Sequence, residues 1–341
     1  MNFISDNAYG ASPEILAAMA DAASGAAVSY GEDAWSARVE ARLAEIFEHE
    51  VAVFPVVTGT AANSLILSQL CPPYGGVLCH EKSHIAVDEC GAPEFFTGGA
   101  KLGLMQGPSA KIAPEAIAKG LGQFASGVHS PKPAVVSITQ ATEFGAVYRP
   151  AEIAALAEAA HERGLKLHMD GARFANALAS LGCSPAEASW KAGVDALSLG
   201  ASKNGALMAE AAVFFNRDDA RDFAYRRKRA GQLVSKMRFV SAQLEAYLKD
   251  DLWLRTAARA NAQAKRLSNG LSKLPDIAIA HPTEANIVFA WMAEAKARRL
   301  HEAGFLFYDW DRADGRIMAR LVCSFATPEA DVERLLEAAR V

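Results

Sequence analysis

Short apolar runs bounded by turn residues alternate with amphipathic, alanine-rich segments along most of the chain. This alternation is typical of parallel strands joined by helices. We predict seven strands, at Val51–Val57, Val77–His80, Leu102–Gln106, Ala134–Thr139, Leu165–Met169, Ala196–Leu199 and Ala211–Asn216. Helices are predicted between them, several beginning with a proline that suits a first helical turn, at Ser36–Phe47, Ala61–Leu70, Pro114–Leu121, Pro150–Glu162 and Pro185–Ala192. The expected fold class is therefore α/β, with a mostly parallel seven-stranded sheet flanked by helices.

The pattern changes after about Asp218, where two long helical stretches, Asp219–Leu248 and Leu252–Leu274, replace the alternation. The tail then returns to short mixed units, with strands expected at 277–280, 286–290, 306–308 and 316–323 and helices at 293–303 and 329–339. We therefore expect an N-terminal arm (1–20), a large domain (21–240) and a small α+β C-terminal domain (241–341).

Bulk composition excludes several classes of protein. The chain has 341 residues, 51% hydrophobic and 22% charged, as expected for a globular protein with one large and one small domain. A formal net charge of -4 gives no sign of a nucleic-acid surface, so no nucleic-acid partner is expected. Basic residues gather only at Arg226-Arg227-Lys228-Arg229, which we interpret as a solvated helix face, with an anion site as the alternative.

The cysteines and the first residues bear on the compartment. Five scattered cysteines without a C-x-x-C pair argue against a disulfide framework and against a thiolate zinc site. The N-terminal residues show no basic segment followed by an apolar one, and no apolar run approaches the roughly 20 residues that span a bilayer. We therefore expect a cytoplasmic protein with no membrane partner.

Two charged residues follow neighbouring strands of the predicted sheet. Asp170 follows the run Leu165–Met169, and Lys203 lies beyond the run Ala196–Leu199. Because ligands of open α/β sheets gather at the carboxyl edge, the two side chains are expected at one site. Pyridoxal 5′-phosphate chemistry needs a carboxylate that keeps the pyridine nitrogen protonated and a lysine amine that holds the aldehyde as a Schiff base. Taken singly, Asp170 is equally well explained as a helix N-cap and Lys203 as a solvated loop charge.

The segment Thr58-Gly59-Thr60 follows the first predicted strand and opens a helix. Backbone N–H groups and hydroxyls at a helix N-terminus form an anion site, and a phosphate is the obvious occupant. A capped helix start without a ligand is the alternative. The presence of Asp170 and Lys203 at the same sheet edge favours the phosphate.

The segment His80-Glu81-Lys82-Ser83-His84 matches the zinc-protease pattern H-E-x-x-H. That pattern binds metal only on a helix, where both histidines share one face. Here His80 ends a predicted strand and Lys82-Ser83 is typical of a loop, so no metal site is predicted. His84 is better placed at a pocket mouth, where an imidazole stacks on an aromatic ring and exchanges a proton near neutral pH. A plain surface histidine is the alternative.

Taken together, the motifs resemble those of a known family. They occur in the order and approximate spacing of the pyridoxal phosphate-dependent L-threonine aldolases of the low-specificity type, which have the aspartate-aminotransferase fold (fold type I). The matching segments are Ser5-Asp6-Asn7, Tyr30-Gly31-Glu32-Asp33, Thr58-Gly59-Thr60, His84 followed by Glu89, Asp170-Gly171-Ala172-Arg173, Ser202-Lys203 and Arg320-Leu321-Val322. Because the likeness spans nearly the whole chain, it is more specific than any single motif.

The resemblance implies how the cofactor would be held in the large domain. Lys203 would carry it, Asp170 would contact the pyridine nitrogen, and Arg173 would lie near the phenolic oxygen. His84 would stack on the ring. The phosphate would lie near Gly59, Thr60 and Ser202.

The resemblance also implies substrate contacts. Ser5 and Arg320 would hold the α-carboxylate, close to Arg173, and an arginine fork matches a carboxylate in two hydrogen bonds. A rim salt bridge is the alternative for Arg320. His129 is similar to a second histidine that the family places near the substrate side chain. Tyr30 would reach the substrate site, or the cofactor of a neighbouring subunit.

Two positions depart from the family pattern. Gln140-Ala141-Thr142-Glu143 stands where members commonly carry Asn-Thr-His, and Asn204 stands where glycine commonly follows the lysine. These departures affect the side-chain pocket and the stereochemical preference more than the cofactor.

The activity implied is retro-aldol cleavage of L-threonine, L-allo-threonine and related β-hydroxy-α-amino acids to glycine and an aldehyde. His84, directly or through water and helped by His129, would remove the β-hydroxyl proton. Cofactor anchoring alone does not distinguish this lyase from an aminotransferase, a β-eliminating lyase or a racemase. A non-catalytic binding protein on the same scaffold is a third interpretation. The fold type implies a homodimer or homotetramer with active sites at the subunit interface.

Overall fold

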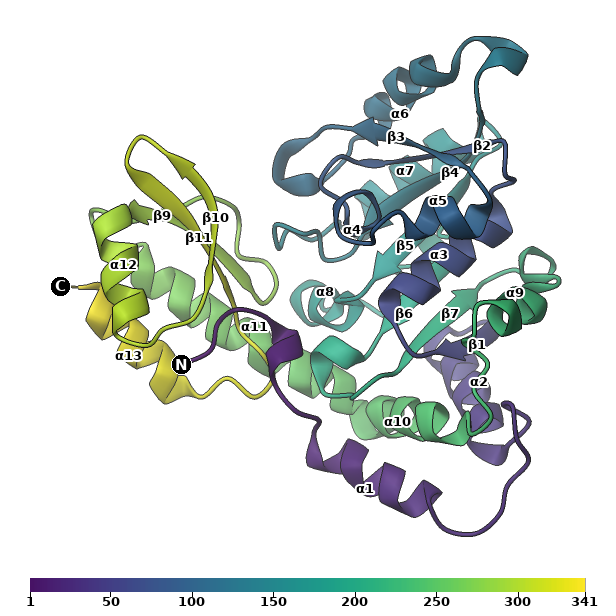
Figure 1. The fold of residues 1–341 in the computed structure, drawn as a ribbon, viewed down its shortest axis with the longest axis horizontal. Helices are drawn as coiled ribbons and strands as arrows, with labels where there is room; N and C mark the ends of the chain where they lie inside the picture. The colour runs from purple at the N-terminus through teal and green to yellow at the C-terminus, as the bar shows by residue number, and fades with distance from the viewer. Residues whose placement is uncertain (341) are drawn as a thin grey trace.

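A computed structural model describes residues 1–340. It consists of a large α/β domain and a smaller α+β domain, and helix α11 (Leu252–Leu271) runs from one to the other (Figure 1). No helix in this part of the chain is both long enough and apolar enough to cross a membrane.

The large domain is built on a seven-stranded sheet with the order β1-β7-β6-β5-β4-β2-β3. All neighbouring strands are parallel except β7, which is antiparallel to both β1 and β6. The predicted mostly parallel sheet is therefore confirmed. The strands are β1 (Ala52–Val56), β2 (Gly75–His80), β3 (Lys101–Met105), β4 (Lys132–Thr139), β5 (Lys166–Gly171), β6 (Ala196–Gly200) and β7 (Glu210–Phe214).

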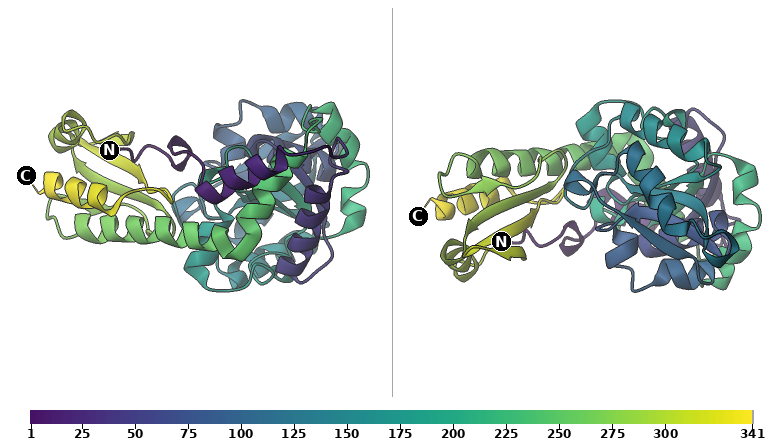
Figure 2. Two further views of the ribbon diagram at one scale, coloured as in Figure 1. Left: turned by 90° about the horizontal axis from the view of Figure 1, so that it is seen from below. Right: turned by 90° about the horizontal axis from the view of Figure 1, so that it is seen from above.

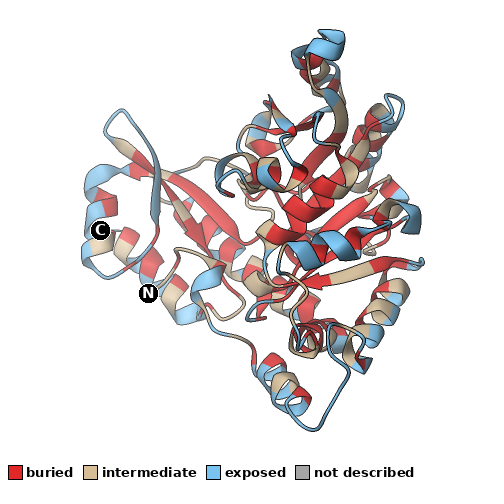
Figure 3. Ribbon diagram, turned by 45° about the vertical axis from the view of Figure 1, so that its right-hand side comes forward, coloured by how far each residue is buried: buried red, intermediate tan, exposed pale blue. Residues whose placement is uncertain are grey.

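Helices cover both faces of this sheet, which explains why its central strands are apolar without alternation. One face packs on α2 (Ala34–Phe47), α6 (Pro114–Leu121), α7 (Pro150–His161), α8 (Phe174–Leu181) and α10 (Arg238–Leu248). The other face packs mainly on α3 (Gly59–Leu70) and α9 (Phe223–Arg229), with α5 (Ala92–Thr97) lying against α3. Buried strands between half-exposed helices are visible in Figure 3.

Two helix predictions are wrong. Pro185–Ala192 forms turns and a short 3-10 helix at Trp190–Ala192, because Ser189 leaves the helical backbone region and its hydroxyl bonds to the Pro185 carbonyl. The predicted helix Asp219–Leu248 is divided into α9 and α10 by a loop in which Gly231 adopts a positive φ of 72°. Composition alone did not reveal α1 (Pro13–Ala22) or α8, which are short and rich in alanine.

The small domain holds an antiparallel four-stranded sheet with the order β10-β11-β9-β8. These strands are β8 (Ala278–Ile279), β9 (Ile287–Ala293), β10 (Tyr308–Ala313) and β11 (Arg316–Val322). Helices α11, α12 (Glu294–Glu302) and α13 (Glu329–Ala339) pack on it around a separate apolar core. The predicted α+β C-terminal domain is confirmed. The borders that separate the arm, the large domain and the small domain after residues 20 and 240 stay predictions.

The N-terminal segment joins the two domains. Phe3 is fully buried in the small domain, where its N–H donates to the Leu306 carbonyl and its carbonyl accepts from Val322. The chain then passes through a 3-10 turn, Asp6–Ala8, and reaches α1, which packs on α10 of the large domain. Figure 2 shows this segment crossing between the domains in two directions of view. The turn therefore lies at the domain junction.

Candidate active site

Asp170 and Lys203 meet at the carboxyl edge of the large sheet, as predicted. Asp170 lies near the end of β5, and Lys203 lies in the 3-10 turn Ser202–Asn204 that follows the neighbouring strand β6. Both line a cavity of about 370 Å³. Its other walls include Thr58, Gly59, Thr60, His84 and Ser202. We call this the inner cavity.

One end of the inner cavity is the N-terminus of α3. Thr58 caps this helix, because its Oγ1 accepts a hydrogen bond from the Ala61 N–H at 3.1 Å. A Cβ added to Gly59 would meet no atom within 4 Å, so the first helical turn opens into free space. The helix dipole and the free N–H groups of that turn favour an anion. Ser202 lies on the wall of the same cavity, where its Oγ accepts from the Ala209 N–H at 3.2 Å.

Lys203 is set up as a nucleophilic amine. Burial, and then the nearby Arg173 guanidinium, lower the pKa of its ammonium group below the usual range. None of the ion pairs within residues 1–340 includes Lys203. Its turn is held from behind by Asn204, whose amide donates to the Tyr247 hydroxyl at 2.9 Å and to the Trp253 carbonyl at 2.8 Å. The asparagine at a position where glycine is common therefore anchors the lysine turn.

A chain of hydrogen bonds runs from Asp170 to His84. The Asn63 amide donates to Asp170 Oδ2 and to Glu89 Oε1, both at 2.8 Å. His84 Nδ1 lies 2.7 Å from the same Glu89 oxygen, so this nitrogen carries the hydrogen and Nε2 is left for other contacts. The hydrogen bond to Glu89 raises the pKa of His84. The Asn63 amide therefore bridges the carboxylates of Asp170 and Glu89, and Glu89 extends the chain to His84.

A buried ion pair fixes Arg173. Its Nε and Nη2 donate to the two carboxylate oxygens of Asp6 at 2.8 and 2.9 Å, and Asn286 of the small domain donates to Asp6 at 3.0 Å. Burial alone would raise the pKa of Asp6, but Arg173 and Lys203 lower it below its usual value. The N-terminal turn, the large domain and the small domain therefore meet at this carboxylate.

A second cavity of about 470 Å³ shares Lys203, His84 and Asn7 with the inner one. We call it the outer cavity. It is also lined by Ser5, Arg173 and Arg320, the last of which comes from β11 of the small domain. The structure therefore brings the predicted carboxylate-binding residues Ser5 and Arg320 together on one wall region.

Arg320 is ready to receive an anion. Burial, and then the Arg173 guanidinium, lower its pKa to about 10, so its charge is poorly compensated inside the chain. Its Nε is buried without a hydrogen-bond partner, and its guanidinium lies 5.4 Å from the ring centroid of Trp310. A carboxylate would satisfy both the charge and the unpaired donor.

Two buried carboxyls that the motif analysis did not assign also line the cavities. Glu143 lines the outer cavity, and burial raises its pKa to about 6. Glu210 lines the inner cavity next to Ser202, whose N–H donates to it at 3.3 Å, and burial raises its pKa to about 7. Glu143 was visible in the sequence only as a departure from the family pattern, and Glu210 gave no signal.

Two further residues of the site were given no role from the sequence. Asn63 follows the predicted anion loop, and Asp6 stands between Ser5 and Asn7. Their functions depend on Glu89, Asp170 and Arg173, which are distant in sequence, so only the folded chain reveals them.

His129 and Tyr30 do not join this site within one chain. His129 is exposed before the start of β4, and the strand's eight residues span about 26 Å to the edge where Glu143 lies. Tyr30 is 46% exposed in a loop where its N–H donates to the Ser235 carbonyl, and Lys228 lies 4.5 Å from its ring centroid. Roles for these two residues stay predictions that require another copy of the chain.

The zinc-protease pattern does not form its helix. His80 ends β2, where Nε2 lies 3.1 Å from the Gly107 carbonyl and Nδ1 accepts from the Lys82 N–H. His84 begins the separate short helix α4 (His84–Val87). The two imidazoles therefore do not share a helical face.

Comparisons with known proteins show the family to which the chain belongs. The model of the beta-eliminating lyase family matches residues 2–295. A protein of Pseudomonas aeruginosa named low specificity L-threonine aldolase is 48% identical over 338 residues, which cover 99% of this chain and 96% of the relative. A relative of the same name from a Pseudomonas species is 48% identical over 333 residues, which cover 98% and 95%.

Solved structures give the same result for the fold. The structure of a threonine aldolase from Leishmania major superimposes with a TM-score of 0.94 at 28% identity, covering 99% of this chain and 98% of the other. The likeness therefore includes both domains and the junction at which the cavities lie.

Proposed function

We propose that this chain, which belongs to the beta-eliminating lyase family, is a low-specificity L-threonine aldolase that uses pyridoxal 5′-phosphate. It is a lyase that cleaves L-threonine, L-allo-threonine and related β-hydroxy-α-amino acids to glycine and an aldehyde. The observation that carries this proposal is the position of Lys203, a buried amine with a lowered pKa that lines the inner and outer cavities at once.

The inner cavity fits the cofactor. The open N-terminus of α3 at Gly59 and Thr60 suits a phosphate, and Ser202 lies beside it. Asp170, held by Asn63, suits a protonated pyridine nitrogen. Bound pyridoxal 5′-phosphate supplies an electron sink for the pair of electrons left on the α-carbon when the Cα–Cβ bond breaks.

The residues of the outer cavity bind the amino acid. Arg320 takes the α-carboxylate, with Ser5 beside it and Arg173 behind it. This contact orients the substrate about its α-carbon, so that the Cα–Cβ bond is the one presented for cleavage. Lys203 would hold the cofactor, and its free amine would return a proton to the α-carbon.

In this proposal His84 contacts the pyridine ring of the cofactor and the side chain of the substrate. Its Nδ1 is fixed on Glu89, so its ring orientation is set before any ligand binds. Its Nε2 is assigned to the β-hydroxyl oxygen of the substrate, where it exchanges a proton directly or through water. These residue roles are testable one by one.

The test is a product assay. Purified protein with added pyridoxal 5′-phosphate is expected to convert L-threonine to glycine and acetaldehyde, and Lys203→Ala is expected to abolish both products. L-threonine, L-allo-threonine and a phenyl-substituted analogue are compared side by side to define the aldehyde preference. A keto-acid product, or turnover that survives Lys203→Ala, would contradict the proposal.

Assembly and compartment belong to the same proposal. A homodimer or homotetramer would bring His129 and Tyr30 of another copy towards this site, where neither residue reaches within one chain. The five cysteines are all free, which suits the reducing cytoplasm. The substrate is a small amino acid, and no nucleic-acid or membrane partner is proposed.

A further inference from the structure

Glu143 follows β4 at the carboxyl edge of the large sheet and lines the outer cavity with His84, Lys203 and Arg320. Its two carboxylate oxygens have different environments. Oε1 accepts from the His84 backbone N–H at 2.9 Å and from the Thr139 hydroxyl at 2.7 Å. Oε2 is buried without any hydrogen-bond partner. An unpaired buried acceptor costs free energy unless a ligand or water satisfies it.

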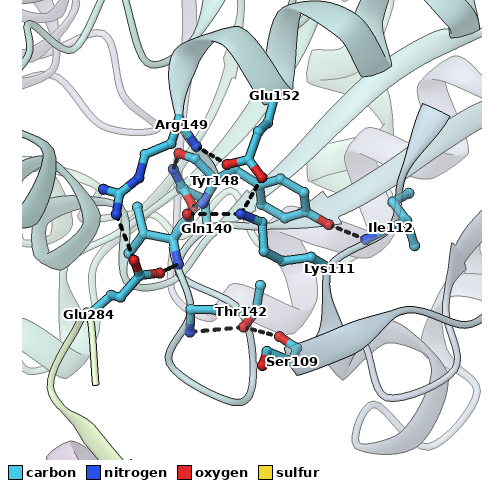
Figure 4. Close-up of polar contacts among 11 residues, drawn as sticks. Ser109, Lys111, Ile112, Gln140, Thr142, Tyr148, Arg149, Glu152 and Glu284 are labelled. Carbon is cyan, nitrogen blue, oxygen red and sulfur yellow. Dashed lines mark hydrogen bonds and ion pairs between the residues drawn. The ribbon is translucent and has the colours of Figure 1, made fainter. Parts of the chain in front are cut away.

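The loop that carries Glu143 is held on both sides. Gln140 makes two hydrogen bonds with the backbone of Tyr148, and the Thr142 hydroxyl donates to the Ser109 carbonyl at 2.8 Å (Figure 4). At its far end, Arg149 pairs with Glu284 at 2.6 Å and Glu152 pairs with Lys111 at 2.5 Å. Since the rest of this polar network is satisfied, the free oxygen of Glu143 is a specific feature and not the result of a loose loop.

The substrate supplies one group that matches this oxygen. Under the proposed function, the α-carboxylate is placed on Arg320 and the α-amino group at Lys203. The β-hydroxyl is the remaining donor, and it faces walls that include His84 and Glu143. Asp88 also lines the cavity, but its side chain is 80% exposed to solvent and its Oδ2 lies 3.6 Å from His84 Nε2.

We infer that Glu143 accepts the hydrogen bond of the substrate β-hydroxyl through Oε2 and takes its proton when the Cα–Cβ bond breaks. The O–H electron pair becomes the second bond of the aldehyde carbonyl, and the Cα–Cβ pair stays with the carbon that becomes glycine. Lys203 returns a proton to that carbon, and Glu143 gives up the proton it took to water, so that the net change moves the hydroxyl proton to the α-carbon. This assignment moves the proton transfer from His84 to Glu143, and the protonated His84 ring then positions the hydroxyl by donating a hydrogen bond from Nε2–H to its oxygen. This inference rests on the proposed function and names the group that selects β-hydroxy substrates.

The electrostatic surroundings suit this task. The cations on the cavity wall are Lys82, Arg173, Lys203 and Arg320. The acids near Glu143 are Asp88, Asp170 and Asp309. With its pKa raised to about 6 by burial, Glu143 is mostly ionised at neutral pH and is a stronger base than an exposed glutamate.

The test is Glu143→Gln. The amide oxygen can replace Oε1 and keep the contacts to His84 and Thr139, while the amide nitrogen replaces the accepting Oε2. A purely structural role would therefore survive this change. We expect kcat/KM for L-threonine to fall about 100-fold, and the acid limb of its pH profile to lose one ionisation.

A ligand that lacks the β-hydroxyl distinguishes a loss of hydroxyl recognition from a loss of the folded site. Binding of L-2-aminobutyrate to the holoenzyme, followed as competitive inhibition and by the change in cofactor absorbance, is expected to be unchanged in Glu143→Gln. Glu152→Gln is the matched control on the same polar network, and its kcat/KM is expected within about twofold of wild type.

Three outcomes overturn the inference. An active wild type with an equally active Glu143→Gln variant overturns it alone, and so does a variant that loses L-2-aminobutyrate binding as strongly as threonine cleavage. A wild type that cleaves no β-hydroxy-α-amino acid overturns the proposed function, and this inference with it.

Discussion

The inner and outer cavities share Lys203 but are built differently. In the inner cavity the carboxylates are hydrogen-bonded within the chain, Asp170 to Asn63 and Glu210 to Ser202, and among the described lining residues only Asn63 Oδ1 is a buried polar atom without a partner. All of the lining residues except Asn7 come from the large domain. The outer cavity is assembled from the N-terminal segment, the four segments that follow β2, β4, β5 and β6 of the large sheet, and strands β10 and β11 of the small domain. Its groups include two buried atoms without partners, Glu143 Oε2 and Arg320 Nε.

This difference suggests that the inner cavity holds the cofactor and the outer cavity recognises the substrate. Groups that are paired before a ligand binds keep a fixed geometry, which suits a cofactor that stays bound through many turnovers. Buried groups without partners gain hydrogen bonds only when a substrate with the right chemistry enters. The inner cavity is therefore expected to govern cofactor chemistry, and the outer cavity to govern substrate choice.

The largest expected effect is in the inner cavity. Asp170→Asn keeps the size of the side chain but removes the negative charge that favours a protonated pyridine nitrogen. Its single amide oxygen can accept from Asn63 or from the Ala172 N–H, but not from both. We expect kcat to fall on the order of 10³-fold, with little change in the inhibition constant of L-2-aminobutyrate. Asp195→Asn, at the opposite edge of the sheet, is the control and is expected to retain its kcat. An Asp170→Asn variant with wild-type kcat would break the distinction between the cavities.

The next effect is on stability at the junction of the cavities. Asp6→Asn leaves the Arg173 guanidinium buried without its counter-charge, which is expected to lower the free energy of unfolding by about 3 kcal/mol. Urea denaturation of the apoprotein at fixed protein concentration measures this change. Glu245→Gln removes an exposed pair with Arg38 and is expected to cost at most about 1 kcal/mol. An equal decrease in the free energy of unfolding in the two variants would show that the buried pair of Asp6 and Arg173 stabilises the chain no more than an exposed pair does.

The third effect is a pH dependence of folding stability that comes from Glu210 in the inner cavity. The pKa of Glu210 is raised from 4.5 to about 7 in the folded state, so the folded chain binds this proton more tightly than the unfolded chain. Its contribution to stability is therefore full below about pH 4.5 and is lost as the pH rises towards 7.

Glu210→Gln is expected to flatten that part of the stability curve of the apoprotein. Thermal unfolding midpoints at a series of pH values measure the slope in both proteins. A slope between pH 4.5 and 7 that is identical in the variant would contradict the assignment of a neutral carboxyl in the inner cavity.

Much of the inner cavity was predictable from the sequence, because its signals are local. Asp170 and Lys203 follow buried strands, and Thr58-Gly59-Thr60 opens a helix, so strand polarity alone brings them to one edge. The sheet itself was predictable because its central strands are buried on both faces and read as short continuous apolar runs.

The outer cavity was only partly predictable. Asp6 pairs with Arg173 across 167 positions, and no local pattern announces such a contact. Glu143 appeared only as a departure from a family motif, since its role depends on which of its oxygens the fold leaves free. His129 shows the converse, because its residue type suggested chemistry while its place before β4 puts it at the opposite edge.

The most direct test of the account is the site of cofactor attachment. The apoprotein is incubated with pyridoxal 5′-phosphate, the linkage is reduced with borohydride, and the modified peptide is identified by mass spectrometry. We expect the label on Lys203, and its loss from that peptide in Lys203→Ala. A label confined to another lysine, or a wild-type protein that takes up no label, would contradict the central claim that both cavities work through this amine.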